Sequence, residues 1–194
     1  MHKYITNQLI ESIDVKRQIL ENHDVLENII DSAKACIAAY ATNNKILIAG
    51  NGGSAADAQH IAGELVSKFY FDRPGLAATA LTTDTSIITA IGNDYGYENL
   101  FSRQLEANGT KGDIFIGIST SGTSENILKA LKECKKKDIF TIGLTGEKLS
   151  QMNHLCDICI NIPSNSTPRI QEAHIVIGHI LCAIIEEKMF GTDF

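Results

Sequence analysis

Apolar residues recur at helical intervals through the N-terminal part of the chain, and residues 3–43 contain neither glycine nor proline. The pattern is interrupted once, near Asn22, His23 and Asp24, which predicts two helices with Asp24 as the cap of the second. We expect this helical pair, residues 1–43, to form an oligomer interface. The alternative is that the pair only covers a sheet formed by later residues.

From residue 45 onward, short apolar strands alternate with helical segments. Almost entirely apolar strands in this alternation are typical of a parallel sheet with helices on both faces. We therefore predict one α/β domain, residues 1–194, built as a three-layer α-β-α sandwich around a mostly parallel sheet. The predicted strands are 45–49, 77–81, 113–118, 138–144 and 156–162, and the predicted helices are 55–69, 83–92, 97–108, 124–136, 147–153 and 167–190.

Composition narrows the possible partners. The formal net charge of -6 gives no general attraction to nucleic acids or anionic membranes. The sequence shows no apolar run of membrane-spanning length and no signal-peptide pattern. Its five cysteines, an odd number, favour a reducing compartment. We expect a cytoplasmic protein with neither nucleic-acid nor membrane partners.

Two loops join a predicted strand to a predicted helix, where ligands bind in open α/β sheets. The first is the glycine loop, residues 50–54, which reads Gly-Asn-Gly-Gly-Ser. Its glycines would let backbone N–H groups approach a ligand closely, although it matches neither the dinucleotide nor the Walker A pattern. The alternative is a tight turn capped by Ser54.

The second loop, residues 119–124, places five hydroxyl side chains around a single glycine, Gly122. A helix cap needs only one or two such side chains. Hydroxyls together with the N–H groups of a helix N-terminus would hold a phosphate dianion without any lysine, as an acidic chain requires. We therefore favour phosphate binding over plain capping for this serine loop.

Three side chains on predicted helices could carry proton or metal chemistry. His60 and Glu64 are one helical turn apart and share a side, although such pairs are common without a metal. The apolar neighbours of Glu64 would suit a general base, and the alternative is a surface carboxylate. His179 lies in an apolar run and needs a partner. We expect the nearby His174 to be more exposed.

These segments resemble the sugar isomerase (SIS) domain family, and more narrowly its phosphoheptose isomerases, over essentially the whole chain. The resemblance implies a flavodoxin-like topology and a homotetramer. It implies conversion of sedoheptulose 7-phosphate to D-glycero-D-manno-heptose 7-phosphate, for lipopolysaccharide or other surface glycans. The matching stretches are 50–54, Asp57–His60 with Glu64, 92–96, 117–122, and Arg169–His174 leading to His179.

The same resemblance implies roles for individual residues. It makes Glu64 and His179 the catalytic pair. It also implies one Zn²⁺ per subunit, with ligands His60, Glu64, Gln171 and His179. The substrate contacts that it implies are Asn51, Gly52, Gly53, Glu64, Asn93, Asp94, Ser119, Thr120, Ser121, Ser124 and Gln171.

The implied zinc ligands raise a geometric problem. Gln171 and His179 are eight residues apart, which is about 12 Å along a straight helix. They cannot then ligate one ion from the same copy. Either the segment around Gln171 is not regular helix or the site joins subunits. We favour the second, and expect Glu64 and His179 to come from different subunits.

Two other readings remain open. One is a related isomerase that acts on another sugar phosphate, such as arabinose 5-phosphate. The other is a non-catalytic relative that binds a replication-initiator protein. Glu64 and His179 favour catalysis.

Overall fold

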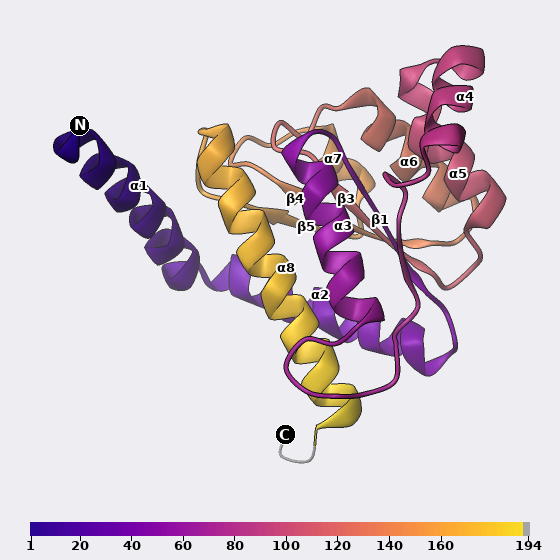
Figure 1. Cartoon of the computed structure of the whole chain (residues 1–194), viewed down its shortest axis with the longest axis horizontal. Coiled ribbons are helices and arrows are strands. Elements are labelled where there is room, and N and C mark those ends of the chain that lie inside the picture. Colours follow the sequence, from indigo (N-terminus) through magenta and orange to yellow (C-terminus); the bar gives the residue numbers. More distant parts are fainter. Residues whose placement is uncertain (192–194) are drawn as a thin grey trace.

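The computed structural model of the chain describes residues 1–191, so the last three residues of the predicted domain lie outside the described residues (Figure 1). The strands are β1 (Ile46–Gly50), β2 (Ala78–Ala80), β3 (Ile114–Ile118), β4 (Phe140–Thr145) and β5 (Ile158–Asn161). The helices are α1 (His2–Glu21), α2 (His23–Ala41), α3 (Gly53–Val66), α4 (Thr85–Tyr95), the 3₁₀ helix η1 (Tyr97–Asn99), α5 (Leu100–Asn108), α6 (Glu125–Lys136), α7 (Gln151–Leu155) and α8 (Thr167–Phe190).

The five strands form one sheet in the order β2-β1-β3-β4-β5, and every neighbouring pair is parallel. This is the flavodoxin-like order, as the sequence predicted. From β1 the chain adds β2 on one side of the sheet, and it then adds β3, β4 and β5 on the other side, so the order of the strands reverses between β1 and β3. The glycine loop follows β1 and the serine loop follows β3. Both loops therefore meet at the topological switch point, where open α/β sheets bind their ligands.

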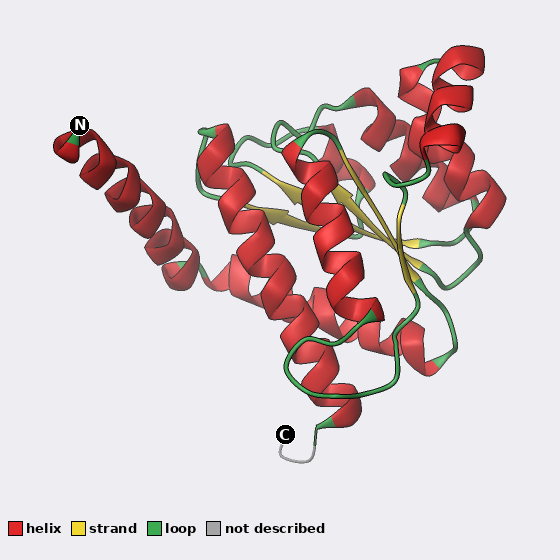
Figure 2. Ribbon diagram, viewed as in Figure 1, coloured by secondary structure: helices red, strands yellow, loops and turns green. Residues whose placement is uncertain are grey.

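Helices cover both faces of the sheet (Figure 2). In β1, Ile46 and Ile48 pack in a core with α2, α3 and α8, while Leu47 and Ala49 face α4, α5, α6 and α7. Because successive strand residues point to opposite faces, an all-apolar strand supplies both cores. The predicted three-layer sandwich is confirmed. Across residues 1–191 no helix has the length and apolarity needed to cross a membrane.

Several element boundaries differ from the predictions. Asn22, not Asp24, caps α2, because its Oδ1 accepts a hydrogen bond from Val25 N at 3.2 Å. Asp24 already lies in the first helical turn, where its charge suits the positive end of the helix dipole. The segment predicted as one helix over 97–108 is the short η1 followed by α5.

Helix α1 projects away from the body of the molecule (Figure 1). Two contacts tie it to the start of α8: Lys16 Nζ lies 3.3 Å from Glu172 Oε1, and Arg169 donates to the carbonyl of Gln8 at 2.6 Å. Much of its apolar side stays exposed, as an uncovered interaction surface would be. The exposed residues are Tyr4, Ile5, Leu9, Ile10, Ile13 and Leu20.

Candidate active site

The glycine loop is fixed by contacts with three other segments. A Cβ on Gly53 would lie only 2.7 Å from Gln171 Nε2, so this position cannot take a side chain while Gln171 of α8 rests there. Asn51 and Asn126 exchange two amide hydrogen bonds, at 3.0 and 2.8 Å. Tyr97 Oη adds a third by donating to Asn51 Oδ1 at 2.9 Å. These bonds tie the loop to α6 and η1.

The serine loop is held largely by its own hydroxyl groups. Ser119 is buried, and its Oγ lies 2.9 Å from Ser124 Oγ and 3.4 Å from Ser121 Oγ. Ser124 is the N-cap residue of α6, yet within the described chain its side chain makes no cap hydrogen bond. Gly122 takes a φ of +65°, which suits glycine, and a Cβ there would clash with Ser150.

The α6 cap therefore does not account for this concentration of hydroxyls. Thr120 and Ser121 also line a cavity of about 200 Å³, so their side chains can be reached by a ligand. The amides at the start of α6 carry the positive end of its dipole. A hydroxyl-rich turn at a helix N-terminus is suited to holding a phosphate group.

The second part of the site is a cluster of His60, Glu64 and His179, formed where α3 and α8 lie side by side (Figure 1). His60 Nε2 lies 3.1 Å from Glu64 Oε1 and 3.3 Å from His179 Nε2. The ring of Phe69 packs at a tilt against His179, with ring centroids 5.6 Å apart. The cluster thus brings a carboxylate base and two imidazoles together in one place.

The donor atoms of this cluster fit a zinc ion. They all lie within 4.8 Å of one another. Nitrogen ligands about 2.0–2.1 Å from a tetrahedral zinc would be about 3.3 Å apart, which matches the two imidazole nitrogens. Without a metal, one N–H on His60 Nε2 would have to serve two acceptors, Glu64 Oε1 and His179 Nε2. A cation bound between these three atoms would accept a lone pair from each of them.

Comparison with known proteins assigns the chain to a family. Residues 11–146 match the family described as the SIS domain. The chain is 63% identical, over all of its length, to phosphoheptose isomerase 2 of Campylobacter jejuni, covering 96% of that protein. It is also 63% identical over its whole length to a phosphoheptose isomerase of Aneurinibacillus thermoaerophilus, covering 98% of it. The chain belongs to the phosphoheptose isomerase family.

The backbone agrees with this assignment. The structure of a phosphoheptose isomerase from Neisseria gonorrhoeae superposes with a TM-score of 0.90 at 40% identity, over 96% of this chain and 98% of that one. The resemblance read from the sequence motifs is therefore confirmed. The roles of individual residues rest on the geometry described here.

The structure of this family member corrects two expectations about the site. Helix α8 is regular from Thr167 to Phe190, so the suggestion of an irregular segment around Gln171 is wrong. Glu64 and His179 meet within one chain, so the expectation that they come from different subunits is also wrong. Gln171, the fourth ligand that the resemblance implies, lies apart from this cluster. It lies at Gly53, eleven residues and about 16 Å along α3 from Glu64.

Asn93 and Asp94 lie at the C-terminal end of α4, both exposed. Asn93 Nδ2 donates to Asp94 Oδ1 at 2.8 Å. They stand just before η1, whose Tyr97 reaches the glycine loop. Their place in the sequence therefore puts them beside an element that contacts the site, and their predicted contact with substrate stays a prediction.

His174 is fully buried, so the expectation of an exposed side chain is wrong. Its Nε2 lies 3.2 Å from the carbonyl of Thr145 at the end of β4. Burial lowers the pKa of His174 to about 4, although the hydrogen bond to Thr145 opposes this. The imidazole is neutral at physiological pH, and it contacts the end of β4 rather than the cluster of His60, Glu64 and His179.

Sequence reasoning gave no role to three residues of the site. Asn126 and Tyr97 hold Asn51, and neither lies in a sequence pattern that identifies its partner. Asp57 is half-buried, and its Oδ2 has no hydrogen-bond partner within residues 1–191. Burial raises the pKa of Asp57 to about 6, against the opposing effect of His60. Asp57 lies one helical turn before His60, in a stretch that matches the family, but neither fact indicated a role for its carboxylate.

Proposed function

We propose that this chain converts sedoheptulose 7-phosphate to D-glycero-D-manno-heptose 7-phosphate through an enediol. The observation that carries the proposal is the convergence of Glu64, His60 and His179 in a chain 63% identical to two phosphoheptose isomerases. Aldose–ketose isomerisation needs a base at carbon and proton exchange at two oxygens. The cluster supplies the groups for both tasks.

In the proposed reaction, Glu64 removes a proton from C1 while His179 donates one to the C2 carbonyl oxygen. The resulting enediol collapses when the Glu64 carboxyl, after its proton has exchanged with solvent, protonates C2 and His179 takes the proton of the C1 hydroxyl. No net proton is gained or lost. Both groups must face the same carbons, which agrees with their meeting on neighbouring helices.

The serine loop would hold the other end of the sugar. Ser119, Thr120, Ser121 and Ser124 offer hydroxyl donors, and α6 offers the positive end of its dipole. Charge-assisted hydrogen bonds of this kind are stronger than neutral ones. Neutral donors allow an acidic chain to bind a dianion at one defined point.

We propose His60, Glu64 and His179 as zinc ligands, joined by Gln171 from another subunit. When bound, zinc would polarise the substrate carbonyl and stabilise negative charge on its oxygen. Because a metal-bound Nε2 has no proton to give, His179 would then exchange its proton through Nδ1. His60 takes no part in the proposed proton transfers. Its contacts with both Glu64 and His179 keep these two side chains facing each other.

We also propose a homotetramer with sites at subunit contacts. Gln171 cannot reach the cluster of its own chain, because it lies beside Gly53 at the other end of α3. Exposed apolar side chains lie next to the cluster on α3, the following loop and α8: Val66, Tyr70, Val176 and Ile180. Dissociation of the oligomer would then abolish turnover. An isolated monomer with full activity would refute the shared site.

The cellular role follows as part of this proposal. The product would supply heptose for lipopolysaccharide or other surface glycans, and the reaction would take place in the cytoplasm. All five cysteines are unpaired thiols in the structure, as a reducing compartment requires.

The test is incubation of the purified chain with sedoheptulose 7-phosphate, with arabinose 5-phosphate in a parallel reaction. We expect conversion of the seven-carbon sugar to the aldose, identified by NMR. Preferential conversion of arabinose 5-phosphate would indicate a different isomerase. If neither sugar is converted, the proposal fails and a binding function is favoured.

A further inference from the structure

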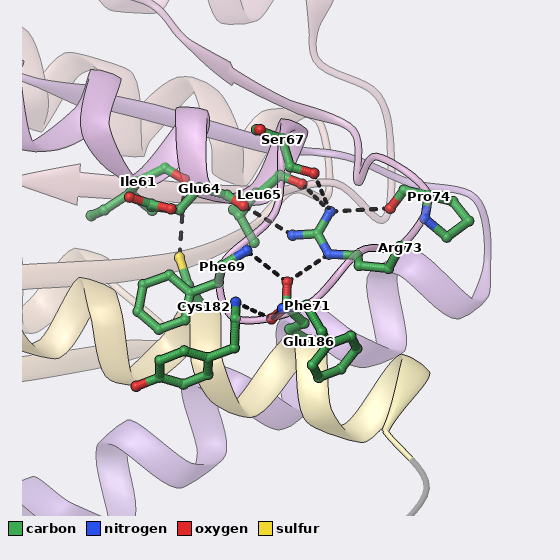
Figure 3. Close-up of polar contacts among 11 residues, drawn as sticks. Ile61, Glu64, Leu65, Ser67, Phe69, Phe71, Arg73, Pro74, Cys182 and Glu186 are labelled. Carbon is green, nitrogen blue, oxygen red and sulfur yellow. Dashed lines mark hydrogen bonds and ion pairs between the residues drawn. The ribbon is translucent and has the colours of Figure 1, made fainter.

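A buried ion pair joins the loop that follows α3 to the last turns of α8. Arg73 Nε lies 2.9 Å from Glu186 Oε2, and each side chain is only 1% exposed (Figure 3). Burying two charges costs free energy that their attraction only partly offsets. Such a pair therefore calls for an explanation beyond stability.

Glu186 organises the loop that follows α3. Its two carboxylate oxygens accept hydrogen bonds from the backbone N–H groups of Phe69, Tyr70 and Phe71, at 2.7, 2.5 and 3.3 Å (Figure 3). Burial alone raises the pKa of Glu186, but these donors and Arg73 outweigh it and leave the pKa below its usual value. The carboxylate is therefore ionised and holds three successive backbone amides.

Arg73 organises the end of α3 itself. Its guanidinium donates to the carbonyls of Leu65 at 2.7 Å and Glu64 at 2.9 Å. It also reaches the carbonyls of Ser67 and Pro74 (Figure 3). The last carbonyls of a helix have no partner within the helix, so an arginine there determines how the final turn is held. That turn carries Glu64.

The same contacts reach His179. The Phe69 amide is held by Glu186, and the Phe69 ring packs on His179, with centroids 5.6 Å apart. Glu186 itself lies seven residues after His179 on α8, about 10 Å along the axis. One ion pair thus contacts the turn that bears Glu64, the loop that packs on His179, and the helix that bears His179.

We propose that Arg73 and Glu186 are a positioning pair for the isomerisation, which set Glu64 and His179 relative to each other. This inference rests on the roles proposed above for Glu64 and His179. The pair touches no reacting atom and acts through the backbone of Glu64 and the ring of Phe69. Loss of the ion pair would therefore lower turnover more than substrate affinity, since the serine loop that would bind the phosphate follows β3 and does not contact the pair.

The chain offers a matched control at the opposite ends of the strands, where their N-termini lie. Asp113 is fully buried beside Lys45, whose Nζ lies 2.7 Å away, and it also accepts from the amides of Lys45 and Thr110. It stands just before β3, at the N-terminal edge of the sheet, opposite the loops of the site. Removing this charge should disturb stability without reaching the cluster.

The experiment compares Glu186→Gln, Arg73→Lys and Asp113→Asn, with sedoheptulose 7-phosphate as substrate, at a temperature where circular dichroism shows each variant folded. We expect Glu186→Gln and Arg73→Lys to lower kcat about 10- to 100-fold while KM changes less than about threefold. We expect Asp113→Asn to lower Tm but keep kcat near that of the parent. Parental kcat in the first two, or an equal loss in all three, would overturn the proposal.

Phe69→Leu covers the case in which the charge variants do not fold, because it keeps apolar bulk and leaves the ion pair intact. We expect lower kcat with little change in Tm, and parental kcat would overturn the proposal. Glu64→Gln separates the positioning role of the ion pair from the role of Glu64 as the base. If Glu64→Gln is inactive while the ion-pair variants are fully active, only the positioning role fails. If Glu64→Gln is active, the assigned base fails as well.

Discussion

The two ends of the site are built in different ways. At the phosphate end, the serine and glycine loops are fixed within one chain by Ser119–Ser124 contacts and by the reciprocal Asn51–Asn126 amides. At the carbonyl end, three side chains converge on the side of two helices, with an exposed apolar rim around them. The contacts that fix the first end lie within one chain, whereas Gln171, proposed above as a fourth zinc ligand, lies away from the second end.

This difference suggests a division of labour. In the proposed reaction, phosphate recognition would use backbone geometry and neutral hydroxyls of one chain. Proton transfer would use side chains whose positions depend on packing between α3 and α8, and on the second subunit that we propose. Variants at the first end should therefore change affinity, and variants at the second should change turnover.

The largest effect is expected from Glu64→Gln. Loss of a general base lowers kcat by about 10²- to 10⁴-fold, while binding of sedoheptulose 7-phosphate should persist because the serine loop is untouched. Steady-state kinetics and calorimetry measure the two quantities. Glu106→Gln, an exposed carboxylate on α5, is the control. Undiminished turnover in Glu64→Gln would remove Glu64 as the base.

Ser121→Ala should weaken binding of the sugar phosphate and leave turnover unchanged, the opposite of Glu64→Gln. Loss of one hydrogen bond to a charged group costs about 1.5–3 kcal/mol, so the Kd for sugar phosphate should rise about 10- to 100-fold. Turnover at saturating substrate should remain near that of the parent. Ser102→Ala on α5, where the hydroxyl donates to the Asn99 carbonyl at 3.2 Å, is the matched control. A large fall in kcat with unchanged Kd would contradict this division.

His60→Ala tests the metal at the carbonyl end. Without this imidazole, added Zn²⁺ should no longer raise Tm, because a ligand that binds the folded state stabilises it by mass action. Metal analysis after dialysis should show less zinc per subunit than in the parent. His23→Ala, a solvent-exposed histidine of α2, should behave like the parent. Full zinc binding by His60→Ala would exclude His60 as a ligand.

The smallest effect concerns Asp57. Its pKa is raised from 3.8 to about 6, so the folded state binds the proton more tightly and stability falls as pH rises from about 4 to 6. Asp57→Asn should therefore raise Tm at pH 7–8 by about 2–4 °C, with less gain at pH 5.

Asp113→Asn should show the reverse dependence. Burial alone raises the pKa of Asp113, but hydrogen bonds from Lys45 and Thr110 leave it below the ordinary value. Its contribution to stability is then present above about pH 4 and lost as pH falls further. Thermal melts between pH 3 and 8 measure both variants. Matching pH profiles would contradict the opposite shifts.

Local patterns predicted the fold, and they identified the serine loop as the candidate phosphate site. Strand–helix alternation determines the layers, and hydroxyl density in the serine loop is visible in six consecutive positions. The burial of His174 could also have been read, since it keeps helical spacing with the buried Ile170 and Ile177. The Asn51–Asn126 and Arg73–Glu186 pairs could not, because they depend on how distant elements dock.

In the proposed reaction, Glu64 moves the proton while the serine loop holds the phosphate. Proton NMR in D₂O with sedoheptulose 7-phosphate tests this division most directly. We expect the parent chain to form the aldose with solvent deuterium at C2. We expect Glu64→Gln to bind the sugar but to leave the C1 protons unexchanged. Exchange at C1 by Glu64→Gln at the parental rate would contradict it.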